Sequence, residues 1–66
     1  MIYFPKIQAI TIEITSRGTL TNAAAYDETG RFRGDLTTGN PEDVNGYVEH
    51  WKTKAEQVTV TETTPA

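Results

Sequence analysis

Apolar and polar residues alternate from Ile7 to Thr15, where the chain reads IQAITIEIT. Ile10, Ile12 and Ile14 fall on one face of this stretch, and small or polar residues fall on the other. Because the side chains of a β-strand point to opposite faces in turn, the pattern predicts a half-buried strand. Residues 58–64, VTVTETT, alternate in the same way and predict another strand.

Turn residues divide the chain after the first strand into two shorter strands. Ser16–Gly18 predicts a turn, and Thr19–Asp27 predicts a strand, although its three alanines would also suit a short helix. Asp27–Gly30 is typical of a type I turn that ends in a left-handed glycine. Arg31–Thr37 predicts the third strand, with Gly34 marking a β-bulge. The three strands would form a β-meander.

A helical period replaces the alternation after this meander. Asn40 is a good N-cap and Pro41 suits the first helical position. Acidic residues follow early and Lys52 and Lys54 follow late, which is the order that the helix dipole favours. The apolar positions form one stripe at helical spacing: Val44, Tyr47, Val48, Trp51 and Ala55.

The element order βββαβ predicts the α+β class, with a helix packed on one face of the sheet in a two-layer sandwich. The whole chain, 1–66, is expected to be a single small domain, with 1–6 an extended N-terminal segment and 65–66 a frayed end. The other sheet face would be open to water. The sheet residues predicted to meet the helix stripe are Ile10, Ile12, Ile14, Leu20, Val58 and Val60.

The size of the chain limits how it can be stabilised. A chain of 66 residues buries only about 60% of the surface that it exposes when unfolded. It has no cysteine for a disulfide and one histidine, His50, so we expect no metal site and no cofactor. Good packing or self-association remains, and a homodimer is one expected solution.

Charge and hydropathy restrict the partners and the compartment. The net charge of −3 has the wrong sign for holding nucleic acid by phosphate neutralisation, so we expect no nucleic acid as the main partner. No apolar run approaches the roughly 20 residues of a membrane span, and the start of the chain does not resemble a secretion signal. We therefore expect no membrane partner and a cytoplasmic location.

Catalytic chemistry has little support in the sequence. No serine lies in a nucleophile motif, the glycines form no phosphate-binding loop, and His50 lies off the apolar stripe. The tripeptide Arg33-Gly34-Asp35 could bind an adhesion receptor only from the tip of a loop, and here it falls in a predicted strand. We expect the chain not to be an enzyme.

The remaining hypothesis is a protein-binding module that acts as an inhibitor, adaptor or accessory subunit of a larger protein. The size and layout are similar to those of many small accessory proteins, some of them encoded by phages and plasmids. Phe32 is expected to face the core, with Arg31 and Arg33 on the open sheet face. The candidate partner-binding residues form a charged turn and an apolar segment: Asp27, Glu28, Arg31, Arg33, Ile2, Tyr3 and Phe4.

The alternative hypothesis is a small nucleic-acid-binding protein. Proteins that hold single strands combine basic side chains with an aromatic platform. The residues that would supply both are Arg17, Arg31, Phe32 and Arg33.

Overall fold

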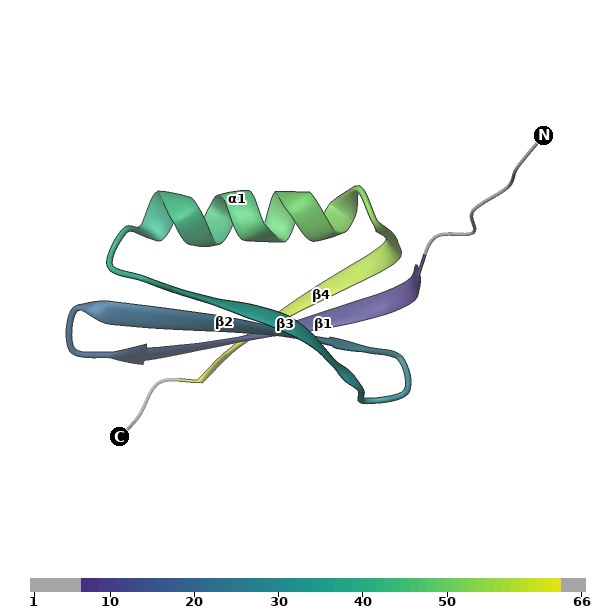
Figure 1. The fold of residues 1–66 in the computed structure, drawn as a ribbon, viewed down its shortest axis with the longest axis horizontal. Helices are drawn as coiled ribbons and strands as arrows, with labels where there is room; N and C mark the ends of the chain where they lie inside the picture. The colour runs from purple at the N-terminus through teal and green to yellow at the C-terminus, as the bar shows by residue number, and fades with distance from the viewer. Residues whose placement is uncertain (1–6, 64–66) are drawn as a thin grey trace.

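The computed structural model describes residues 7–63 and confirms the element order βββαβ (Figure 1). The predicted segments 1–6 and 65–66 lie outside the described residues. The elements are β1 Ile7–Arg17, β2 Leu20–Asp27, β3 Phe32–Thr38, α1 Pro41–Lys52 and β4 Ala55–Thr63.

The four strands form one mixed sheet in the order β3-β2-β1-β4. The antiparallel meander β1-β2-β3 is as predicted, and β4 adds to the free side of β1 in the parallel direction. The helix leaves the β3 edge, crosses one face of the sheet and returns the chain to the β4 edge (Figure 1). The result is the expected two-layer α+β sandwich.

Local residues define where each element begins and ends. Gly18 and Gly30 have φ angles of 60° and 85°, which confirms the left-handed glycine at both predicted turns. The Asn40 side chain accepts a hydrogen bond from the Glu42 N–H at 3.0 Å, so Asn40 is the N-cap, and Pro41 begins α1 as predicted.

The core lies between α1 and the centre of the sheet. Ile10 and Ile12 are almost fully buried, and Val44 and Trp51 cover them from the helix. Alanines of β2 lie beside the isoleucines on the same face: Ala25 is paired with Ile12 and Ala23 with Ile14, and both are 0% exposed. Their small side chains allow the helix to approach the sheet closely.

Two predictions about the core are wrong. The helix ends at Lys52, so Ala55 is not part of the helical stripe but the first residue of β4, where it is buried. Leu20 and Val60 were expected in the core, but they are 52% and 43% exposed. Leu20 lies three residues before the helix-side Ala23, so its side chain is on the open face of the sheet. Val60 is on the edge strand β4, which α1 covers only in part.

Candidate binding surfaces

The β2–β3 turn is organised by the side chain of Asp27. Its Oδ1 accepts hydrogen bonds from the Thr29 hydroxyl at 2.6 Å, the Thr29 N–H at 2.9 Å and the Arg31 N–H at 3.0 Å. The Gly30 N–H donates to the Asp27 carbonyl at 2.9 Å and closes the turn. Asp27 is therefore a structural residue of the turn rather than a free recognition group.

The electrostatics of the turn support the same role. The Arg33 guanidinium lies 3.5 Å from the other carboxylate oxygen of Asp27. The hydrogen bond from the Thr29 hydroxyl, with those from the Arg31 and Thr29 N–H groups and the charge of Arg33, lowers the pKa of Asp27 below its usual value. Asp27 is accordingly ionised at neutral pH, and it holds Arg33 against the turn.

Phe32 lies on the opposite face from the one predicted. Gly34 is paired with Ala25, but the next pair joins Phe32 to Tyr26, so the register shifts by one residue at Arg33. This shift is the bulge predicted near Gly34, and it reverses the alternation of side chains before it. Phe32 therefore shares the open face with Tyr26 and is 54% exposed, while Arg33 reaches the helix-side residue Asp27.

An aromatic pair consequently lies on the open face of the sheet beside the turn. The rings of Tyr26 and Phe32 meet edge to face with their centroids 5.8 Å apart. Arg31, directly before Phe32, is exposed and forms no ion pair with any described residue. We call the aromatic pair and the exposed turn residue Arg31 beside it the aromatic–arginine surface. Arg31 directly precedes Phe32, so the alternation of the strand directs its side chain away from the open face that was predicted for it.

The remaining predicted residues do not join this surface. Arg17 is the last residue of β1 and is paired with Leu20, about 20 Å from the turn along the eight residues of β2, so the four residues of the nucleic-acid hypothesis do not form one patch. Glu28 lies at the turn and accepts a long hydrogen bond, 3.4 Å, from the Ala9 N–H. Ile2, Tyr3 and Phe4 lie outside the described residues.

The Arg33-Gly34-Asp35 tripeptide is part of β3, in agreement with the hairpin interpretation. Arg33 is paired with Asp27, and the Asp35 carboxylate accepts a hydrogen bond from the Asn22 amide at 3.1 Å. Gly34 has a φ angle of 141° and lies below the hydroxyl of Tyr47. The tripeptide is not at the tip of a loop, so it lacks the presentation that receptor binding requires.

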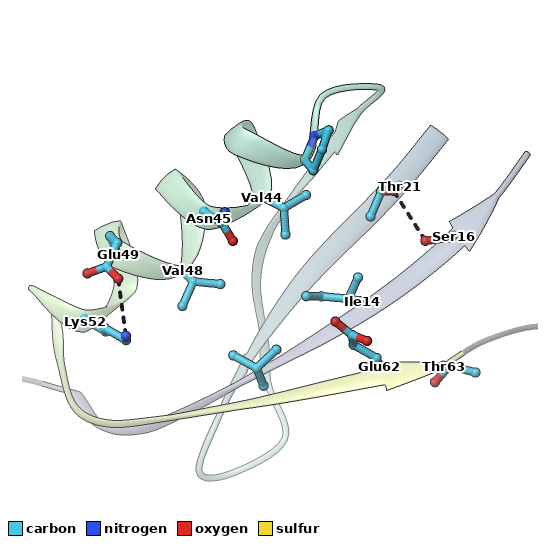
Figure 2. A pocket seen from close by; sticks show the side chains of 12 residues that line it. Ile14, Ser16, Thr21, Val44, Asn45, Val48, Glu49, Lys52, Glu62 and Thr63 are labelled. Atoms are coloured by element: carbon cyan, nitrogen blue, oxygen red, sulfur yellow. Dashed lines mark hydrogen bonds and ion pairs between the residues drawn. The ribbon is translucent and has the colours of Figure 1, made fainter. Parts of the chain in front are cut away.

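A second surface was not predicted from the sequence. An open groove of about 460 Å³ lies between α1 and the ends of β1 and β4. Figure 2 shows Val44 and Val48 pointing from the helix toward Ile14 across this hollow, with Glu62 on the far wall. Glu49 and Lys52 form an ion pair of 3.3 Å on its rim. We call this hollow the α1–β4 groove. Val60 lines it and stays partly exposed, because the helix does not cover this side chain completely.

No protein family, curated protein or solved structure matches the chain. Within residues 7–63, no group of three or more acidic or histidine side chains is arranged to hold a metal ion. The helix of the described part is neither long nor apolar enough to cross a membrane. The two surfaces are therefore judged on their own geometry.

Proposed function

We propose that the chain is a small, non-catalytic protein-binding module that acts as an inhibitor, adaptor or accessory subunit of a larger protein. The observation that supports this proposal best is the aromatic–arginine surface. Phe32 keeps 54% of its surface in water although it is a large apolar side chain. Tyrosine and arginine are enriched among the residues that dominate the binding energy of protein interfaces, and aromatic rings supply large contact areas there.

The charges around this surface favour a protein partner over a phosphate backbone. Asp35 and Glu13 lie on the same sheet face as the aromatic pair, because each is paired with Ala24. Arg33 is neutralised by Asp27, which leaves Arg31 as the exposed cation next to Phe32. A mixed-charge surface with an aromatic centre suits a protein interface, whose rim is polar and whose core excludes charge.

The experiment compares the wild type with Arg31→Ala, Phe32→Ala in a pull-down from the native host. Proteins that the wild type retains and the double variant loses are then titrated against both forms. We expect the double variant to bind at least tenfold more weakly, about 1.4 kcal/mol, and to melt within a few degrees of the wild type. Arg17→Ala is the matched control, because it removes an arginine at the end of β1, far from the β2–β3 turn.

Unchanged binding by the double variant would show that the aromatic–arginine surface is not part of the interface. The nucleic-acid alternative is tested on the same samples with a single-stranded oligonucleotide. Binding that weakens steeply with salt and requires Phe32 would replace the protein-binding proposal, because phosphate contacts release counterions and base stacking needs an exposed ring.

A further inference from the structure

The open face of the sheet is the side that α1 does not cover (Figure 1). The strand register arranges its side chains in rows. One row places Tyr26 beside Phe32, and the adjacent row places Ala24 between Glu13 and Asp35. Ala24 is only 9% exposed although it lies outside the buried cluster under α1, so the longer side chains around it shield it. An aromatic pair therefore adjoins two carboxylates that flank one small side chain.

The two carboxylates keep their negative charge on this face. The Asp35 Oδ2 accepts a hydrogen bond from the Asn22 amide at 3.1 Å, which orients the carboxylate without neutralising it. Glu13 and Asp35 are both exposed, and neither forms an ion pair with a described residue. Both groups are therefore free to meet a cation from outside the described residues.

The arginines of the chain lie away from this pair of carboxylates. Arg33 is paired with Asp27 on the helix side of the sheet. Arg31 comes directly before β3, and the alternation of the strand directs it away from the open face. Arg17 shares the open face, but it lies four residues beyond Glu13 along β1, about 13 Å away. The open face beside the aromatic pair is therefore acidic, and a complementary partner is basic there.

The geometry favours an arginine over a lysine as the group that binds. The two carboxylates project from β1 and β3, whose backbones are about 10 Å apart on either side of β2. A guanidinium carries N–H donors along several edges of its plane, so it can donate to both carboxylates at once. Its flat face also packs on aromatic rings, and the ring of Tyr26 lies only one row away, about 7 Å along β2.

We propose that the open face of the sheet binds an arginine side chain of a partner protein between Glu13 and Asp35. The guanidinium lies beside the ring of Tyr26, and an apolar neighbour of the arginine covers Phe32. The carboxylates select the charge of the partner, and the exposed aromatic ring supplies apolar contact area. This inference rests on the protein-binding function proposed above, and it adds the chemistry of the partner.

The same carboxylates oppose docking of a second copy on this face. A two-fold axis near Ala24 would bring the carboxylates of one copy against those of the other, within the roughly 10 Å that separates packed sheets. Like charges placed together in an interface weaken binding. A different protein that carries an arginine is therefore the better match.

The experiment titrates ¹⁵N-labelled protein with a synthetic peptide, acetyl-GLTRTLG-amide, and follows the backbone amide signals. In an extended peptide the arginine and both leucines share one side, so either direction of binding presents a leucine to Phe32. Matched peptides replace the arginine by citrulline, its neutral isostere, or by lysine. The site variant Glu13→Gln, Asp35→Asn removes both charges and keeps the side-chain shapes. Its control, Glu49→Gln, Glu62→Gln, changes the net charge equally in the α1–β4 groove.

We expect the arginine peptide to shift signals around Glu13, Ala24 and Asp35 and to bind about tenfold more tightly than the citrulline peptide. The lysine peptide should lie between them, because an ammonium group lacks the planar face. Raising the salt concentration should reduce the preference for arginine. The site variant should bind the arginine and citrulline peptides equally, and the control variant should keep the preference of the wild type.

Three peptide results would overturn the proposal. The first is no binding, or equal binding of the arginine and citrulline peptides by the wild type. The second is a set of shifted signals that leaves out Glu13 and Asp35. The third is a preference for arginine that the site variant keeps.

The pull-down separates this inference from the function on which it rests. A host protein that the Arg31→Ala, Phe32→Ala variant loses, and that the site variant binds as tightly as the wild type does, would overturn arginine recognition and leave the protein-binding function in place. Host proteins retained equally by the wild type and by both variants would count against the function itself.

Discussion

Trp51 gives the sharpest test of how this small domain is held together. It is 7% exposed, it belongs to the buried cluster under α1, and its ring meets Tyr47 edge to face at 6.3 Å. Replacing a buried tryptophan with alanine costs roughly 3–5 kcal/mol through lost burial and the cavity left behind. A domain of 66 residues has a total stability of only about 3–10 kcal/mol.

A second observation places the expected cost at the lower end of this range. The Trp51 indole N–H is buried and has no hydrogen-bond partner among the described residues. A buried donor without a partner costs about 1–3 kcal/mol, and the alanine variant no longer carries this cost. We therefore expect Trp51→Ala to lose about 3 kcal/mol, which corresponds to a melting temperature at least ~12 °C lower in a domain of this size.

The assay is urea and thermal unfolding followed by far-ultraviolet circular dichroism, because the substitution removes the only tryptophan fluorophore. Trp51→Phe keeps an aromatic ring and removes the unpaired N–H, so its loss should be smaller than that of alanine by about 2 kcal/mol. Val60→Ala is the exposed control and should lose about 1 kcal/mol or less. An alanine variant that melts cooperatively within ~3 °C of the wild type would refute the reasoning.

Three further predictions test two glycines, the ionisation of Asp27 and self-association. Gly46→Ala should raise the free energy of unfolding by about 0.5–1 kcal/mol, because Gly46 is helical with open space around it. Gly34→Ala should lower the free energy of unfolding by roughly 1–3 kcal/mol, because Gly34 has a positive φ. Urea midpoints equal to that of the wild type would contradict both expectations. Because the pKa of Asp27 is lowered on folding, its stabilisation is present at neutral pH and is lost as the pH falls below about 4; unfolding curves of Asp27→Asn should therefore depend less on pH in that range than those of the wild type. Sedimentation at tens of micromolar tests the expected homodimer, and removal of residues 1–4 should give monomers; a dimer that survives the deletion excludes that segment as its interface.

Most of the fold could be predicted because its signals are local. The alternation through Ile10, Ile12 and Ile14 defines a strand whose buried face needs no knowledge of its neighbours. Asn40 caps the helix with its own side chain, and Gly30 closes its turn with a backbone that other residues rarely adopt. Each of these features is decided within a few residues, so the sequence alone predicts it.

The errors occur where a distant element decides the outcome. A bulge was expected at Gly34 and occurs at the neighbouring Arg33, but only the register with β2 shows that it moves Phe32 to the open face. Val60 has the pattern of a core residue, and its exposure depends on how far α1 extends over β4. The α1–β4 groove follows from the same packing, which explains why no motif in the sequence predicted it.

The two edges of the sheet are built differently, and this difference limits how a partner can bind at each of them. The β3 edge is interrupted by a bulge at Arg33 and carries charged side chains, features by which proteins prevent strands from pairing with an edge. A partner that meets this side must use side-chain contacts, and Phe32 and Arg31 provide them. The β4 strand keeps one register with β1, and its outer side offers main-chain hydrogen-bonding groups. Phe32→Ala should therefore weaken a partner that meets the β3 side and leave the β4 edge unchanged.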